Sequence, residues 1–162
     1  MANKAKHPDL SQPDYAMLLS FRCTLREFLQ FSEKAAKRIG VAPQQYQALL
    51  AIKGFPERER ITINEMAEKL MIRHNSAVGL VNRMEKEGLV KRYPSLEDRR
   101  QVHVMLTSRG MRIFEKLAAA HREELNRIGP QLRSFSLHFS RDAAARASRT
   151  ARQSSGGRRR SR

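Results

Sequence analysis

Four consecutive charged residues, 97–100, read Glu-Asp-Arg-Arg and lie between two apolar runs of the chain. Arginine side chains carry a fixed fork of hydrogen-bond donors and attract anions such as phosphate, so Arg99 and Arg100 could bind one. Charged turns are also common on protein surfaces, and a solvated turn without a function is the alternative interpretation. The choice depends on the elements that hold this segment and on the charge of the whole chain.

A second set of polar residues with helical spacing lies between positions 73 and 86. The apolar residues of this stretch recur at Ala77, Leu80, Val81 and Met84, and we expect them to face a core. The opposite face is then small, polar and basic, as contacts to base edges and phosphates require. It consists of Asn75, Ser76, Gly79, Asn82, Arg83 and Lys86, preceded by Arg73 and His74 where the helix begins.

Gly79 is notable because a glycine inside a helix costs roughly 1 kcal/mol relative to alanine. One interpretation is a close approach of the helix backbone to DNA. The other is a tolerated residue on an exposed face, and the sequence leaves both open.

Capping residues and hydrophobic periodicity locate the elements that must position these side chains. They predict helices over residues 12–39, 43–54, 62–70, 75–87 and 107–128. Residues 71–74 form a short turn between the third and fourth helices, which is typical of a helix-turn-helix. Residues 89–93 and 102–106 are expected to form a hairpin with the charged segment at its tip. The fold class predicted is therefore mainly α with a small β-wing, a winged helix-turn-helix.

The chain is strongly basic, with a formal net charge of +16 and an isoelectric point near 11.1. Residues 131–162 hold nine arginines and one aspartate, which leaves half of the excess charge on the remainder of the chain. A surface of this charge attracts polyanions, nucleic acid first and anionic membrane second. No apolar run is long enough for a signal core or a membrane span, and we expect a cytoplasmic protein associated with the nucleoid.

The sequence resembles the MarR family of transcriptional regulators from about residue 15 to residue 128. The segment DRRQVHVMLTSRG matches the family's wing motif of Asp-x-Arg, an apolar strand, Leu-Thr and Gly. The segments APQQYQALLAI and HNSAVGLVNRMEKEGLV match its second helix and its recognition helix with the first wing strand. Each match is moderate, and their order and spacing make the combination strong.

The resemblance implies a homodimer on double-stranded DNA, with the dimer interface built from the first and last helices. It also implies that Arg100 enters the minor groove, that Asp98 orients Arg100, and that Arg99 contacts a phosphate. The function implied is a repressor relieved by a small aromatic or lipophilic effector. The operator, the target genes and the effector's identity cannot be read from the sequence.

The domain organisation expected is a flexible N-terminus (1–10), a MarR-like domain (11–140) and a disordered basic tail (141–162). Within the domain, residues 43–107 form the DNA-binding lobe and residues 11–40 and 107–140 the dimerisation helices. The C-terminal part departs from the family, because Phe135, Leu137 and Phe139 alternate and no stripe with helical spacing is sustained. The dimer interface is therefore the part of the resemblance with the least support.

Other classes of function find little support. We see no Gly-rich phosphate loop, paired carboxylates or Ser-His-Asp set, and expect no enzyme, no metal site and no cofactor. Cys23 is the only cysteine, and the position of the peroxide-sensing cysteine in some relatives aligns nearer Leu18, so we interpret Cys23 as an unreactive residue at the edge of a helix rather than a redox sensor. The alternative function is a sequence-indifferent nucleic-acid-binding or ribosome-associated protein that binds through its basic tail.

Overall fold

The computed structural model describes residues 10–55, 60–94 and 102–156, with side chains described as far as residue 140. The chain divides into two compact units, one of residues 29–123 and one of the residues on either side of that range. Two long helices, α1 (Gln12–Arg38) and α5 (Ser108–Gly156), contribute to both units.

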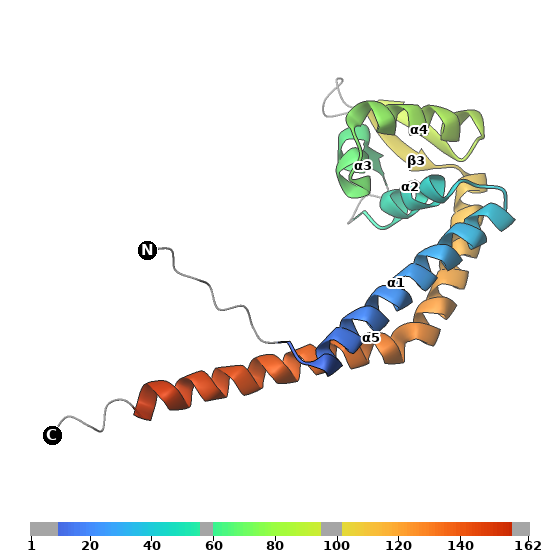
Figure 1. Ribbon diagram of the computed structural model, residues 1–162. Helices are drawn as coiled ribbons and strands as arrows, with labels where there is room; N and C mark the ends of the chain where they lie inside the picture. The colour runs from blue at the N-terminus through green and yellow to red at the C-terminus, as the bar shows by residue number, and fades with distance from the viewer. Residues whose placement is uncertain (1–9, 56–59, 95–101, 157–162) are drawn as a thin grey trace. The chain divides into compact units, whose positions relative to one another are not determined.

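The unit of residues 29–123 contains the predicted helix-turn-helix and hairpin (Figure 1). Its helices and strands are α2 (Pro43–Lys53), β1 (Ile61–Thr62), α3 (Ile63–Leu70), α4 (His74–Lys86), β2 (Val90–Pro94) and β3 (Val102–Leu106). The three strands form one antiparallel sheet in the order β1-β3-β2. Mainly helical architecture with a small β-wing is thus confirmed.

The core of this unit is formed by apolar side chains from α2, α3, α4 and the sheet. Leu49, Met66, Met84 and Val104 are among its fully buried members. Burying an aliphatic side chain of this size contributes about 1.5–3 kcal/mol to the stability of the fold. The shared core therefore holds α4 and the hairpin in a fixed position relative to each other. The buried face of α4 predicted from spacing is confirmed, because Ala77, Leu80, Val81 and Met84 are all buried.

Capping residues fix where the helices begin. At α3 the Thr62 Oγ1 accepts a hydrogen bond from Glu65 N at 3.2 Å, and the Glu65 carboxylate accepts one from Thr62 N at 2.8 Å. At α1 the Asp14 carboxylate accepts hydrogen bonds from both Ser11 N and Ser11 Oγ at 2.7 Å. Such caps satisfy amide groups that have no partner inside the helix.

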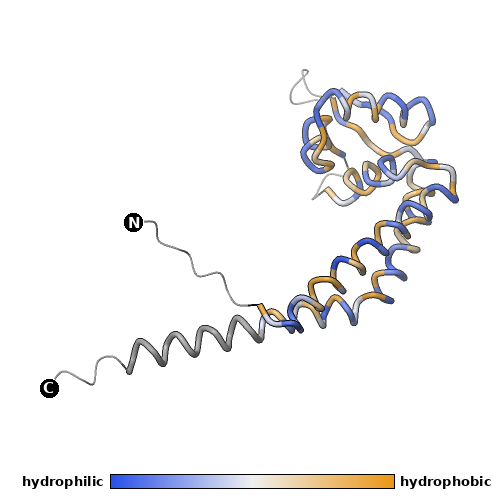
Figure 2. The backbone as a smooth tube through the Cα atoms, viewed as in Figure 1, coloured by the Kyte–Doolittle hydropathy of each residue, from blue (hydrophilic) through white to orange (hydrophobic). Residues whose placement is uncertain are grey.

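The second unit pairs the N-terminal part of α1 with the C-terminal part of α5. The rings of Phe21 and Phe135 meet edge to face with centroids 5.3 Å apart. The His138 imidazole Nε2 lies 2.7 Å from the Asp14 carboxylate, which is almost completely buried. In Figure 2 apolar and polar residues alternate along α1 and along α5 as far as residue 140. Leu19 of α1 and Leu137 of α5 are more than half exposed, so apolar side chains lie in solvent as well as between the helices.

Three expectations from the sequence need correction. Strand β1 was not predicted, because two residues are too short for an alternating pattern to be visible. Helix α5 does not end at residue 128 but continues through Pro130. The buried residues Ile128 and Phe135 lie on either side of this proline, and their packing offsets the roughly 3 kcal/mol that an interior proline costs.

The third correction concerns the tail, for which we expected disorder from residue 141. The backbone of residues 141–156 is helical and continues α5. Residues 141–156 are rich in alanine and arginine and have too few apolar side chains for a buried core. Alanine and arginine are among the best helix formers, so this segment favours a helix as its local structure.

Candidate nucleic-acid interface

The exposed face of α4 is the surface on which the predicted contact residues gather. Seven of them are exposed: Arg73, His74, Asn75, Ser76, Asn82, Arg83 and Lys86. Gly79 lies half-buried among them. The face therefore presents hydroxyl, amide, imidazole and cationic groups with no large apolar side chain between them, as the spacing predicted.

Gly79 has room for a side chain. A Cβ at this position would lie 3.6 Å from the Arg83 guanidinium Nη1, an ordinary contact with the end of a flexible side chain. Packing within the described part of the chain therefore does not require glycine here. The close approach to DNA and the tolerated residue both remain as explanations.

The N-terminal end of α4 is open. Arg73 occupies the N-cap position with extended backbone, and no side chain of the described residues caps the helix there. The first amide groups of a helix lack partners within it, and the helix dipole gives this end a partial positive charge. This end can therefore receive an anionic oxygen.

The turn before α4 carries an unusual residue. Met71 has φ 53° and ψ 44°, in the left-handed region, and its side chain is 91% exposed. A non-glycine residue in this conformation is disfavoured, and it is held here because Ile72 N donates to Ala67 O at 2.9 Å. The sequence pattern identified the turn but did not reveal this geometry.

A contact network that sequence reasoning missed connects α4 to the wing. The Arg92 guanidinium of β2 donates from Nη2 to Asn82 Oδ1 at 2.6 Å and forms an ion pair with the Glu85 carboxylate. The Arg92 amide also donates to Glu85 Oε1 at 3.3 Å. Asn82 is thus oriented by the wing strand beside it. The alternation of β2 could have revealed this, because Arg92 shares a face with the buried Val90.

The acidic residues at the end of α4 are engaged by neighbouring groups. Glu85 pairs with Arg92, and Glu87 accepts a hydrogen bond from Gln45 Nε2 at 2.8 Å. Gln45 is buried and its Oε1 in turn accepts from Ala42 N at 2.7 Å. The ion pair with Arg92 offsets the negative charge of Glu85 near the basic face of α4.

The base of the wing is well defined. Strands β2 and β3 pair in register from Val90 with Leu106 to Pro94 with Val102. The chain leaves and re-enters the sheet at neighbouring positions, with residues 95–101 between them. The predicted wing residues Asp98, Arg99 and Arg100 lie outside the described residues.

The return from the wing into α5 is anchored by a threonine and a glycine. The Thr107 Oγ1 donates to Gly88 O at 2.6 Å and accepts from Gly110 N at 3.0 Å. A Cβ at Gly110 would lie 2.0 Å from Leu89 O, so only glycine fits this contact. The Thr and Gly of the wing motif therefore fix the start of α5 against the end of the turn after α4.

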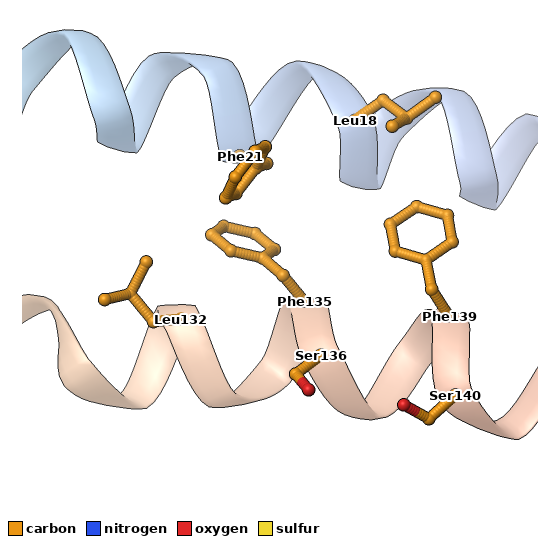
Figure 3. Close-up of a pocket in the computed structure, with 7 residues that line it drawn as sticks. All are labelled: Leu18, Phe21, Leu132, Phe135, Ser136, Phe139 and Ser140. Atoms are coloured by element: carbon orange, nitrogen blue, oxygen red, sulfur yellow. The ribbon is translucent and has the colours of Figure 1, made fainter. Parts of the chain in front are cut away.

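The second unit contains an apolar groove of about 500 Å³. Figure 3 shows Phe21 of α1 and Phe135 and Phe139 of α5 pointing into the space between the helices. Leu18, Leu132, Ser136 and Ser140 complete its lining. Sequence reasoning did not identify these as pocket residues, because the alternation of Phe135, Leu137 and Phe139 concealed the helical spacing of Leu132, Phe135 and Phe139.

Two further observations concern the described part of the chain. None of its helices has the length and apolar character that crossing a bilayer requires. It also holds no cluster of three or more His, Cys, Asp or Glu side chains placed to bind a metal ion. Cys23 is exposed on α1 rather than packed.

A helix-turn-helix whose second helix exposes a polar, basic face, followed by a hairpin fixed to that helix, defines a winged helix-turn-helix protein. A family model described as the MarR family matches residues 39–101. The organic hydroperoxide resistance transcriptional regulator of Bacillus subtilis (strain 168) is 30% identical over 116 residues, which span 72% of this chain and 75% of that protein. The chain belongs to the MarR family of transcriptional regulators.

Solved structures share the fold at lower identity. A mutant of MepR from S. aureus, bound to an oligodeoxyribonucleotide, is 20% identical with a TM-score of 0.58, over 91% of this chain and 99% of that one. NadR in complex with 4-hydroxyphenylacetate is 21% identical with a TM-score of 0.58, over 91% of this chain and 97% of that one.

Proposed function

We propose that this protein is a sequence-specific DNA-binding repressor whose binding to DNA is relieved by a small-molecule effector. The observation that carries the proposal is the exposed face of α4, where amide, hydroxyl and cationic side chains stand on a helix rigidly held by the core. A helix of this kind fits the major groove, which is about 12 Å wide. The fold shared with DNA-bound MepR supports the assignment.

In this proposal Asn75, Ser76 and Asn82 contact base edges and Arg73, His74, Arg83 and Lys86 contact phosphates or guanines, with Gly79 at the closest approach. The wing follows the family motif: Arg100 enters the minor groove, Asp98 orients it and Arg99 contacts a phosphate. The Arg92 bridge to Asn82 and Glu85 then holds wing and recognition helix at a fixed spacing.

We further propose a homodimer formed by the helices of the second unit. Within this unit Tyr15, Leu19 and Leu137 are more than half exposed, and Leu18 and Leu25 expose 40% of their surface. Apolar side chains presented together in this way mark an interaction site, and a second copy offers a matching surface. The dimer would bring the apolar groove next to the partner's helices. Residues 11–40 and 107–140 are the dimerisation helices of this proposal, and residues 43–107 its DNA-binding lobe.

The remaining parts of the proposal follow from the regulatory role. The protein acts on the bacterial nucleoid in the cytoplasm and catalyses no reaction. The effector is a small organic molecule, in line with the 4-hydroxyphenylacetate found on NadR. The sequence-indifferent alternative is less well supported, because an unspecific binder has no use for the hydrogen-bonding side chains between the cations of α4.

Selection from a random duplex library tests the central claim. We expect enrichment of a pseudo-palindrome whose half-sites lie about 10 base pairs apart, one helical turn. Unlabelled random DNA should then compete poorly for the selected sequence. Selection that enriches no sequence would favour the sequence-indifferent alternative.

Sedimentation tests the dimer. Leu19→Glu places a charge on the exposed apolar surface of the second unit and is expected to yield monomers and weaken DNA binding. Leu50→Glu changes another exposed leucine, on α2 outside the second unit, and serves as the control, which should remain a dimer. A wild-type protein that is monomeric both alone and on DNA would contradict the proposed assembly.

A further inference from the structure

The sheet has a second face, opposite α4, and this face holds a cavity. Side chains of paired residues lie on the same face, and the pairs Tyr93 with His103 and Lys91 with Met105 alternate with those that face α4. Arg60 precedes Ile61, whose side chain is in the core, so Arg60 lies on the same outer face. A cavity of about 340 Å³ is lined by Arg60, Tyr93, Pro94, His103 and Met105.

Polar groups that line this cavity lack partners among the described residues. The Arg60 Nε is buried and has no hydrogen-bond partner among the described residues. His103 is only 6% exposed, and no hydrogen bond of its imidazole is found in the same part of the chain. Buried polar groups are nearly always paired, so an unpaired guanidinium nitrogen at a cavity wall indicates a missing partner.

Among the described residues, the charge around the cavity is positive. The lining residues that the structure describes include no acid, and the Lys91 ammonium lies 4.8 Å from the centroid of the Tyr93 ring. The missing partner is therefore an anion. A guanidinium donates two parallel hydrogen bonds to a carboxylate or a phosphate, and an imidazole N–H can supply one more.

The other walls indicate the rest of the ligand. Tyr93, Pro94 and Met105 present ring and thioether surfaces that suit a flat apolar body. The volume falls at the small end of ligand cavities and fits about one ring. Duplex DNA would have no need of such an apolar recess, and the His103 imidazole, at 6% exposed, is too deeply buried for the sugar-phosphate backbone to reach.

We propose that this cavity on the outer face of the wing sheet binds a small organic anion with one apolar ring, its head held by Arg60 and His103. The inference deepens the proposed function, because it rests on that function to make the anion an effector. Pro94 and Val102, where residues 95–101 leave and rejoin the sheet, lie at the end of the hairpin that carries the cavity. An anion there lowers the positive charge beside the DNA-reading segment and weakens DNA binding.

Calorimetric titration of the full chain with benzoate, without DNA, tests the site. We expect saturable binding with a Kd below about 1 mM, which corresponds to a modest binding free energy per non-hydrogen atom for a ligand of this size. Benzyl alcohol, which has the ring but no charge, should bind at least about ten-fold more weakly, since a charge-assisted hydrogen bond is worth about that factor. Phenyl phosphate distinguishes a carboxylate site from a phosphate site.

Variants locate the binding. Arg60→Gln should weaken benzoate binding at least about ten-fold, whereas Arg112→Gln, which removes an exposed arginine of α5, should leave it unchanged. If Arg60→Gln does not fold, NMR of the imidazole resonances of the wild type tests the site instead. Benzoate should then shift the resonance of His103 more than that of His121. Equal binding by wild type and Arg60→Gln, or no saturable binding up to about 10 mM, would overturn the proposal.

The link to regulation is measured separately. Benzoate should lower the affinity for the selected DNA, and by reciprocity the DNA should lower the affinity for benzoate by the same factor. Absence of any DNA binding would contradict the proposed function but leave the cavity's ligand intact. Loss of DNA binding in Arg60→Gln, with no benzoate binding by the wild type, would make Arg60 a DNA phosphate contact and refute the effector site.

Discussion

At the scale of single residues, the proposed wing is tested by the direction in which substitutions of Arg100 and Asp98 change the affinity for DNA. If Arg100 enters the minor groove as proposed, Arg100→Ala removes a positive group from it and should weaken binding by roughly 1–3 kcal/mol, the usual scale of one specific contact. Asp98→Ala removes a negative charge near DNA, which simple electrostatics says should strengthen binding. If Asp98 holds Arg100 in position, it should weaken binding instead. Affinities at one fixed salt concentration, with circular dichroism to check the fold, distinguish the two.

Tighter binding by Asp98→Ala would mean that residues 97–100 are only a charged turn. The matched control is Asp142→Ala, which removes an acid of the C-terminal tail outside the wing. Simple electrostatics predicts the same small gain in affinity for both acids, so a loss confined to Asp98 identifies a positioning role.

Gly79→Ala separates the two explanations that remain for this glycine. The space beside Gly79 accepts a methyl group, so the variant should be more stable to urea by roughly 1 kcal/mol. If the backbone approaches DNA here, the same variant should bind the selected sequence at least about ten-fold more weakly, the scale of one specific interaction with DNA. A variant that is more stable and binds equally well would show a tolerated residue.

The exposed and buried residues of α4 could be predicted from the sequence, because a period of 3.6 residues leaves little choice of face. The partners of those residues could not. The bridge from Arg92 to Glu85 and Asn82 joins residues seven and ten positions apart across a turn. Arginine, glutamate and asparagine at those positions are equally consistent with solvent exposure. Met71 in the left-handed region is a similar case, since no residue preference favours it.

At the scale of elements, the start of α5 gives a prediction with a control in the same helix. Gly110→Ala would place a Cβ 2.0 Å from Leu89 O, where backbone must move, and should destabilise the protein by about 1–3 kcal/mol or more. Gly129→Ala meets only the flexible end of Arg133 at 3.7 Å and should stabilise it by roughly 1 kcal/mol. Urea unfolding of both variants measures the difference. Equal effects would contradict the tight contact between α5 and the turn after α4.

Elements with local signals were predictable, and those that depend on distant packing were not. Helix α3 begins at a capping box and α4 ends just before Gly88, so these two limits follow from the chain itself. Strand β1 exists only because Ile61 and Thr62 meet β3 across more than forty residues of sequence. The extension of α5 depends on the contacts of Phe135 and His138 with α1, which compensate for Pro130.

At the scale of the whole molecule, the net charge of +16 makes binding to DNA sensitive to salt. If about 6–10 phosphates are neutralised, affinity should fall on the order of 10³–10⁵ between 50 and 200 mM salt. Fluorescence anisotropy over this range measures the slope. An affinity independent of salt would remove the electrostatic basis of the proposed interface.

The C-terminal residues 141–162 separate charge from specificity, because they hold eight arginines and lie outside the recognition helix and the wing. Their removal should weaken binding to the selected and to random DNA by the same factor, since ion pairs with phosphate carry no sequence information. The slope of affinity against salt should decrease by about one for each phosphate that the truncated chain no longer neutralises. The core of α2, α3, α4 and the sheet contains none of these residues, so the melting of the helix-turn-helix unit should change little. A truncated chain without preference for the selected sequence would show that the tail, rather than α4, distinguishes one DNA from another.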